Sequence, residues 1–269
     1  MRNIHYITFG GGSPALRGAL KTRQDQARRA GFFSSITTIS DIDLTNDHDF
    51  WISHGDFIKN NPRGYGYWLW KPYIILKHLS SIQEGDILYY ADVGCEVNRL
   101  GGVNLDRYND IIDKQDILLF ELNHPARKWT KGDLLSLFPD LRTRNQLVGG
   151  VIGLKACAKS RDIIESWFEL CSRDGYHYLD DSPSNTDNDE IFREHRHDQA
   201  CLTAAVTAYD NIVFLNESEF YFDTMADKPF LVLRNRTEKL KTIQIEILGK
   251  KYIILKRRNK LPKLYSSKR

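Results

Sequence analysis

A carboxylate at the end of a buried strand is the feature of this sequence that most directly indicates chemistry. An unbroken apolar run from Ile87 to Ala91 ends at Asp92. A run of this length without polar interruption predicts a strand that is buried on both faces. Sheets of parallel strands place their ligands at the carboxyl ends of those strands. We therefore expect Asp92 to line the main cleft of the protein.

The segment before this strand combines aromatic side chains with a lysine. From Arg63 the chain reads R-G-Y-G-Y-W-L-W-K-P-Y, and its aromatic residues are Tyr65, Tyr67, Trp68, Trp70 and Tyr73. So dense a cluster is partly exposed, and aromatic faces stack well on sugars and bases. Pro72 favours a first helical position. Lys71, at the head of that helix, is placed to meet a diphosphate or a sugar hydroxyl, or is an ordinary surface lysine.

A second acidic position opens a later helix. The segment from Glu194 reads E-H-R-H-D-Q-A and leads into an apolar helix that runs through Val206. Asp198 is either a helix cap or a catalytic carboxylate. His195 and His197 alternate without a third partner, which is a weak signal for zinc.

The stretch from Arg63 to Asn98 resembles glycosyltransferases of the GT-A type. The match is closest to a bacterial polysaccharide branch that has a W-x-W-K-P segment and an Asp-x-Gly-Cys variant of the D-x-D motif. The resemblance implies a Rossmann-type α/β fold with a mixed, mostly parallel sheet flanked by helices. It also implies transfer of a sugar, a hexose such as galactose, from a nucleotide-diphosphate donor, a UDP-sugar. The acceptor would be a glycan or a lipid-linked chain of a capsule or O-antigen.

The resemblance also implies a divalent cation, Mn²⁺ or Mg²⁺, between the acidic motif and the donor diphosphate. Asp92 matches the first carboxylate, but Gly94 stands where the second would be, so Glu96 or Asn98 is the substitute. The metal-binding histidine that many relatives carry near the C-terminus has no counterpart here. Arg234 or Arg236 is then expected to neutralise the diphosphate.

Further site residues follow from the same resemblance. The Asp198-Gln199 pair is similar to a motif that places a carboxylate beside the anomeric carbon, so Asp198 is the candidate base, with His197 and Glu121 as alternatives. Gly149-Gly150 is similar to a strand that faces the donor sugar, or is a plain bulge. Inversion and retention both stay open.

A glycine loop follows the first expected strand. Residues 4–9 alternate as a strand, Gly10-Gly11-Gly12 come next, and Ser13 caps a helix that Pro14 begins and Gly31 ends. Phe9, Gly10 and Gly11 are candidates for donor binding because bare backbone approaches an anion or a base closely. A plain turn explains the glycines equally well, since the spacing is not G-x-G-x-x-G.

The remaining chain predicts alternating strands and helices. Expected strands are 36–39, 116–120, 146–154, 211–215 and 219–222; expected helices are 47–62, 134–138 and 160–171. Residues 1–238 are taken as the transferase domain, and residues 239–269 as a basic tail with a hairpin over 242–255.

Bulk properties limit the class of protein. The chain has 269 residues and four cysteines without metal or disulfide spacing, which indicates reduced thiols of a cytoplasmic protein. Its start does not look like a signal peptide. Nothing approaches the ~20 apolar residues of a membrane helix.

Charge is unevenly distributed along the chain. Residues 239–269 hold eleven Lys and Arg and one acid, a net +10, so residues 1–238 carry −7 of the total +3. The tail predicts peripheral binding to the anionic inner face of the cytoplasmic membrane, or is a solvated end. An acidic body argues against nucleic-acid binding, while a non-catalytic module that binds a nucleotide sugar or a glycan stays open.

Overall fold

The computed structural model describes residues 2–221, 225–233, 240–257 and 262–266. Its central sheet has the strand order β2-β1-β3-β8-β5. The bounds are β1 Ile4–Gly10, β2 Ser35–Ser40, β3 Ile87–Ala91, β5 Ile117–Leu118 and β8 Val151–Lys155. β1 pairs with β2 and β3 in parallel, whereas β8 runs antiparallel to both β3 and β5. The expected α/β fold with a mixed, mostly parallel sheet is confirmed.

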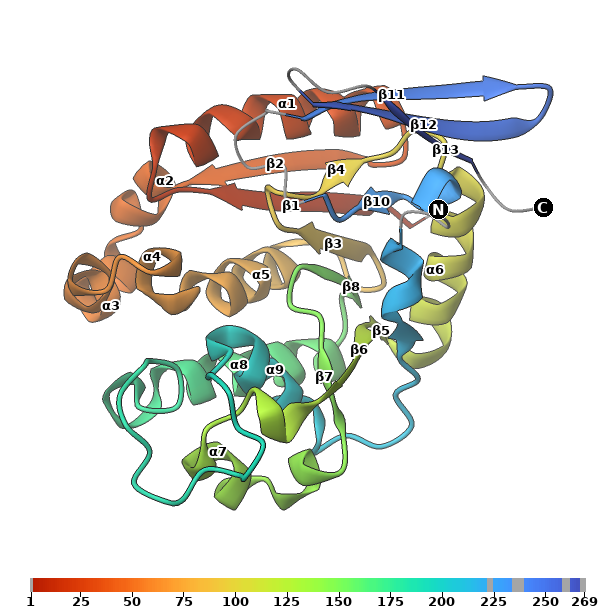
Figure 1. Cartoon of the computed structure of the whole chain (residues 1–269). Helices are drawn as coiled ribbons and strands as arrows, with labels where there is room; N and C mark the ends of the chain where they lie inside the picture. Colours follow the sequence, from red (N-terminus) through yellow and green to blue (C-terminus); the bar gives the residue numbers. More distant parts are fainter. Residues whose placement is uncertain (1, 222–224, 234–239, 258–261, 267–269) are drawn as a thin grey trace.

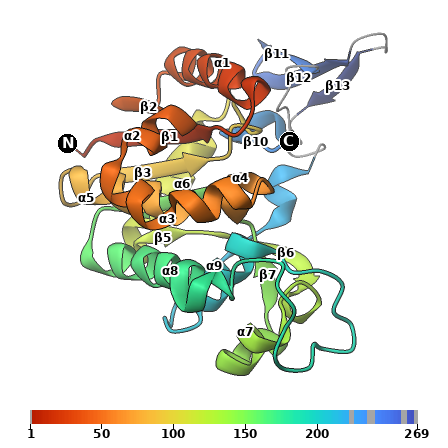
Figure 2. The same cartoon turned by 90° about the vertical axis from the view of Figure 1, so that its left-hand side faces the viewer.

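Helices cover both faces of this sheet (Figures 1 and 2). The helices are α1 Pro14–Ala30, α2 Asp41–Asn46, α3 His48–Asn60, α4 Gly64–Tyr67, α5 Trp70–Ser81, α6 Gly102–Gln115, α7 Gly132–Leu137, α8 Ala158–Tyr176 and α9 His197–Val206. Buried residues of α5, α8 and α9 share one large core cluster, and Ala27 of α1 joins buried residues of α6 in a second large one. The Ser13 cap, the Pro14 start and the left-handed Gly31 end of α1 agree with the sequence.

The central strand β3 joins the two cores. Leu88 and Tyr90 belong to the cluster with α5 and α8, whereas Ile87, Tyr89 and Ala91 belong to the cluster with α6. All five residues are buried, as the unbroken apolar run predicts. Burial on both faces fixes the carboxyl end of β3, and therefore Asp92, inside the fold.

Two small sheets extend from the central one. β6 (Phe120–Pro125) lies between β7 (Asn145–Leu147) and β9 (Leu215–Asn216), and β4 (Glu96–Val97) pairs with β10 (Phe230–Leu231). The strand expected over 146–154 is therefore divided at Gly149-Gly150 between two sheets. Of the strand expected over 211–215 only Leu215 lies in a strand, so that prediction is wrong for most of its length. Of the strand expected over 219–222, Glu219 and Phe220 belong to the 3₁₀ helix Glu217–Phe220, and residue 222 lies outside the described residues.

The C-terminal segment forms a third small sheet, β11 (Leu240–Ile247), β12 (Lys250–Arg257) and β13 (Lys263–Ser266). The expected hairpin is confirmed, and its two turn residues Leu248 and Gly249 both have positive φ, as tight hairpins prefer. β13 was not expected. The predicted domain boundary at residue 238 lies outside the described residues.

This sheet packs on the rest of the chain. Ile253 and Leu255 share a buried cluster with Met225 and Leu231. The Gln244 side chain accepts a hydrogen bond from the Arg99 backbone and donates one to the Val97 carbonyl. Within the described residues, no helix has the length and apolar character needed to span a bilayer.

We expect Ile253→Ala to lower the free energy of unfolding of the whole protein by about 2–5 kcal/mol, because it leaves a cavity in this cluster. Ile243→Ala in β11 is the matched control, since Ile243 is 50% exposed. Urea denaturation monitored by tryptophan fluorescence measures both. Equal, small effects of the two substitutions would show that the sheet is not part of the cooperative fold.

Candidate functional site

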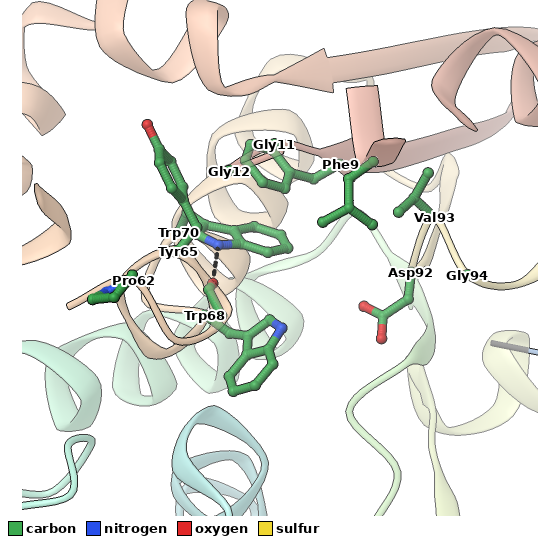
Figure 3. A pocket seen from close by; sticks show the side chains of 12 residues that line it. Phe9, Gly11, Gly12, Pro62, Tyr65, Trp68, Trp70, Asp92, Val93 and Gly94 are labelled. Carbon is green, nitrogen blue, oxygen red and sulfur yellow. Dashed lines mark hydrogen bonds between the residues drawn. The ribbon is translucent and has the colours of Figure 1, made fainter. Parts of the chain in front are cut away.

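Asp92 lines a pocket at the carboxyl ends of β1 and β3 (Figure 3). The lining residues are Phe9, Gly11, Gly12, Leu16, Pro62, Gly64, Tyr65, Trp68, Trp70, Asp92, Val93 and Gly94. Figure 3 shows the Asp92 carboxylate directed toward the open space beside the Trp68 ring. Four residues predicted for donor binding, Phe9, Gly11, Trp68 and Asp92, thus meet in one pocket.

A buried lysine lies behind the Asp92 carboxylate. The Nζ atom of Lys71 is 2.7 Å from Oδ2 of Asp198 and 3.4 Å from Oδ1 of Asp92, and it donates a hydrogen bond to the Gly149 carbonyl. The Lys71 side chain is only 4% exposed. Three acceptors thus surround the three ammonium hydrogens. The structure places Lys71 between the two carboxylates, not on the pocket surface where a donor phosphate contact was expected.

Lys71, Asp92 and Asp198 form an ion triad. Opposing effects act on the charges of its members. Desolvation disfavours the Lys71 ammonium, but Asp198 and Asp92 together raise the pKa of Lys71. Burial raises the pKa of Asp198 to about 6, against the lowering effect of Lys71. Lys71 is therefore charged, and Asp198 titrates close to neutrality.

The two carboxylates differ in exposure and support. The Asp92 side chain is 32% exposed and that of Asp198 is 6% exposed. The hydroxyl of Tyr90 donates a hydrogen bond of 2.5 Å to Oδ1 of Asp92. Trp167 Nε1 donates to the backbone carbonyl of Asp198 and so fixes the start of α9. Asp92 is the acid that meets the pocket, and Asp198 lies deeper.

The glycine pair 149–150 lies against both acids. A Cβ added at Gly150 would be 3.1 Å from Oδ2 of Asp92, and one at Gly149 would be 3.5 Å from Oδ2 of Asp198. The backbone also holds Asp92 directly, because its N–H donates to the Gly150 carbonyl. The missing side chains let the backbone of the glycine pair pass close to the Oδ2 atoms of both carboxylates, and that of Asp198 is buried there. This close approach explains the paired glycines better than a plain bulge does.

The aromatic loop has an unusual backbone. All five residues from Gly64 to Trp68 have positive φ, including Tyr65 (55°), Tyr67 (51°) and Trp68 (62°). Left-handed conformations cost roughly 1–2 kcal/mol for each non-glycine residue. Trp70 Nε1 donates to the Gly64 carbonyl and holds the turn closed. Strain of this kind is concentrated at functional sites, and here it places Trp68 and Tyr65 on the pocket wall.

The glycine loop after β1 serves two purposes. A Cβ at Gly10 would lie 2.4 Å from the Leu16 carbonyl, so Gly10 allows β1 to pack on α1 and does not line the pocket. Gly11 and Gly12 do line it. The N–H of Gly12 donates to Asp41 Oδ2, which ties the loop to the end of β2.

His197 packs against the aromatic loop of residues 64–68. Its ring is 4.7 Å from that of Tyr67 and 5.7 Å from that of Trp68. Nδ1 is within hydrogen-bond distance of the Leu179 carbonyl, so the ring nitrogen there carries the proton and donates it. Burial lowers the pKa of His197. The His197 imidazole is neutral and only 2% exposed, and it supports the loop.

The other predicted site residues lie elsewhere. Glu96 is 2% exposed in β4, accepts a hydrogen bond from Gln26 and does not line the pocket. Arg234 lies outside the described residues. The structure adds Gly12, Tyr65 and Trp70 to the pocket; their place in a glycine loop and an aromatic cluster was the available signal.

Comparisons with known proteins give distant similarities only. No protein-family model matches the chain, and no curated protein matches it. One similar solved structure is a glycosyltransferase involved in the glycosylation of the major capsid of PBCV-1 (12% identity, 85% of this chain, 91% of that chain, TM-score 0.41). Another is mouse xyloside xylosyltransferase 1 (10%, 78% and 83%, 0.41), and a third is mannose-6-phosphate isomerase from Helicobacter pylori (11%, 64% and 79%, 0.35). Similarities this low define no activity.

The raised pKa of Asp198 predicts a pH-dependent stability. A carboxyl group whose pKa is about 6 when folded and 3.8 when unfolded stabilises the fold fully below the unfolded pKa, and loses that contribution as pH rises through the folded pKa. Relative to Asp198→Asn, the wild type should therefore lose on the order of 3 kcal/mol of unfolding free energy between about pH 4 and pH 7. Urea denaturation across this range measures the difference. A difference that does not change with pH would contradict the assignment.

Proposed function

We propose that this protein transfers a glycosyl group from a nucleotide-diphosphate sugar, a UDP-hexose such as UDP-galactose, to a hydroxyl group of a glycan or lipid-linked acceptor. The observation that carries the proposal is the pair of acids, Asp92 and Asp198, held by Lys71 at an aromatic pocket. The W-x-W-K-P and Asp-x-Gly-Cys segments, which suggested this chemistry, supply Lys71 and Asp92. Synthesis of a bacterial surface polysaccharide is the proposed setting.

The pocket walls suit the parts of such a donor. The rings of Phe9 and Trp70 are stacked with centroids 3.8 Å apart, and Tyr65 stacks on Phe9 at 6.2 Å. Phe9 and Trp70 are buried and support the wall, while the partly exposed rings of Tyr65 and Trp68 provide apolar platforms for a base or a sugar ring. The bare backbone of Gly11 and Gly12 lies against the same aromatic residues, since a Cβ at Gly12 would be 3.2 Å from Tyr65 and one at Gly11 would be 2.6 Å from the Phe9 ring.

The two acids have different roles in the proposed reaction. Asp92, the exposed one, contacts the donor where its diphosphate meets the sugar. Asp198 is the candidate base, because a carboxylate with a pKa of about 6 is ionised at neutral pH and still basic enough to accept a proton from an acceptor hydroxyl. The Oδ2 atom of Asp198 is buried against Lys71, so accepting that proton requires a movement on substrate binding that exposes this atom. Lys71 is a positioning residue that orients both acids.

A divalent cation at Asp92 remains part of the proposal. Mg²⁺ is usually held by one or two carboxylates together with substrate phosphates. Asp92 alone meets that description, and among the described residues no three His, Cys, Asp or Glu side chains form a group that holds a metal ion by themselves. When bound, the cation would neutralise charge on the departing diphosphate. Arg234 is the further proposed contact for that charge.

A non-catalytic function has one observation in its favour. The Asp198 side chain is 6% exposed and paired with Lys71, so the pocket can bind a nucleotide sugar without using this acid. Binding of a nucleotide sugar without turnover in the presence of any acceptor distinguishes this candidate from a transferase.

We expect Asp92→Asn and Asp198→Asn each to lower the transfer rate by about 10² to 10⁴-fold, the usual effect of removing a positioned acid or base. Gly149→Ala should reduce transfer with little effect on stability, because the added Cβ would lie against Asp198 Oδ2 at an ordinary contact distance of 3.5 Å and hinder its movement. Asp56→Asn, at a 93% exposed side chain, is the matched control. Product is measured by mass spectrometry with a panel of nucleotide sugars and acceptor glycans. Wild-type rates in a variant that melts like the wild type would remove that residue from the mechanism.

Cation binding should depend on the nucleotide. Calorimetric titration with Mn²⁺ alone should give no heat of binding at this site, whereas titration in the presence of UDP should, because the phosphates complete the coordination shell. Asp92→Asn should abolish the second signal and leave cation-free UDP binding. Equal UDP affinity with Mn²⁺ and with a chelator would contradict the proposed cation.

A further inference from the structure

The C-terminal sheet has an exposed aliphatic face. Successive residues of a strand point to opposite faces. Ile253, Leu255 and Tyr265 face the body of the protein, where they contact Met225 and Leu231. Their neighbours on β11, β12 and β13 therefore face away from it.

Aliphatic side chains cross all three strands on this outward face. Ile243 pairs with Ile254, and Ile254 pairs with Leu264. Ile245 and Tyr252 form the next pair. Ile243 is 50% exposed and Leu264 is 61% exposed. We call the residues Ile243, Ile245, Tyr252, Ile254 and Leu264 the outer ladder.

Lysines lie at both ends of the outer ladder. Lys241 pairs with Lys256 at one end, and Lys250 pairs with Ile247 at the other, all on the same face by the strand register. Leu248, at the hairpin tip, is 98% exposed. Glu246, the only acid of the chain after residue 238, pairs with Lys251 on the opposite face. The outward face is thus apolar in the middle and cationic at its ends.

We propose that this face binds an anionic lipid bilayer, with the outer ladder entering the headgroup boundary and Lys241, Lys250 and Lys256 contacting lipid phosphates. Exposed contiguous apolar surface rimmed by polar groups marks interaction sites. Interfacial binding combines buried apolar area with electrostatic attraction to anionic lipids. Both parts are present on one face. Figure 1 shows the β11–β12 hairpin reaching beyond the other elements, so a flat surface can approach it.

The lysines of this face favour an anionic bilayer as its binding partner over a second copy of this chain. Two copies stacked through this face would bring the same lysines together, and like charges across an interface oppose association. An anionic surface attracts all of them. The proposal does not depend on the proposed transfer reaction, because neither the outer ladder nor its lysines belong to the pocket.

The test is sedimentation of the full chain with vesicles of phosphatidylcholine alone and of equal parts phosphatidylcholine and phosphatidylglycerol. We expect binding to the anionic vesicles only, decreasing as salt is added. Ile243→Thr with Leu264→Thr should weaken it about tenfold through lost apolar burial, while threonine keeps the strand propensity. Lys241→Gln and Lys256→Gln should each weaken it about fivefold.

Matched controls come from other exposed sites. Ile52→Thr replaces a 71% exposed isoleucine of α3, and Lys21→Gln replaces an 82% exposed lysine of α1. Neither should change vesicle binding. Vesicle binding that the outer-ladder variants leave intact, or that salt leaves unchanged, would overturn the proposal. A dimer in solution that Ile243→Thr with Leu264→Thr dissolves, without any vesicle binding, would overturn it in favour of a second copy.

Discussion

The Lys71 ammonium, buried between two carboxylates, is the interaction on which the site depends. An isolated charge at this depth is strongly disfavoured, and removing one partner from a buried ion pair typically costs about 3–5 kcal/mol. Lys71 therefore requires Asp92, Asp198 and the Gly149 carbonyl to be close together. This requirement connects α5, the end of β3, the turn before β8 and the start of α9. The rings of Trp70 and Tyr90, about 6 Å from Nζ, complete the enclosure.

Backbone strain and close packing around this triad position the residues that form the pocket walls. The left-handed run from Gly64 to Trp68 turns the chain sharply just before α5, so that Trp68 stands on the pocket wall while Lys71, three residues later, points inward. The His197 ring packs against Tyr67 and Trp68 of the same run and supports it. On the far side, Gly149 and Gly150 allow backbone contact with both acids. One charge arrangement and one strained turn together produce an aromatic pocket with an acid at its edge.

Local patterns in the sequence predict most of the elements. The apolar run to Ala91 predicts β3 and the place of Asp92, and Ser13, Pro14 and Gly31 predict the ends of α1, because caps and breakers act within a few residues. Helix α5 begins at Trp70, two residues before Pro72, which still lies in the first turn, where a missing N–H is tolerated.

Tertiary contacts determine the structural features that local sequence patterns do not predict. The partners of Lys71 lie far along the chain, so its role between two acids has no local signal. Residues 146–154 have the apolar character of one strand, yet contacts with Asp92 and Asp198 divide them at the glycines. The left-handed conformation of Tyr65, Tyr67 and Trp68 goes against residue preference and exists only because the surrounding structure holds it.

The central claim is that a nucleotide-diphosphate sugar binds in the pocket beside Asp92. A crystal structure of the protein with a bound UDP-hexose tests it most directly. We predict the diphosphate next to the Asp92 carboxylate, a ring of the ligand against Trp68 and the sugar directed toward Gly149 and Asp198. A ligand bound elsewhere, such as in a separate pocket lined by Glu121, Arg144 and Phe214, would contradict the account.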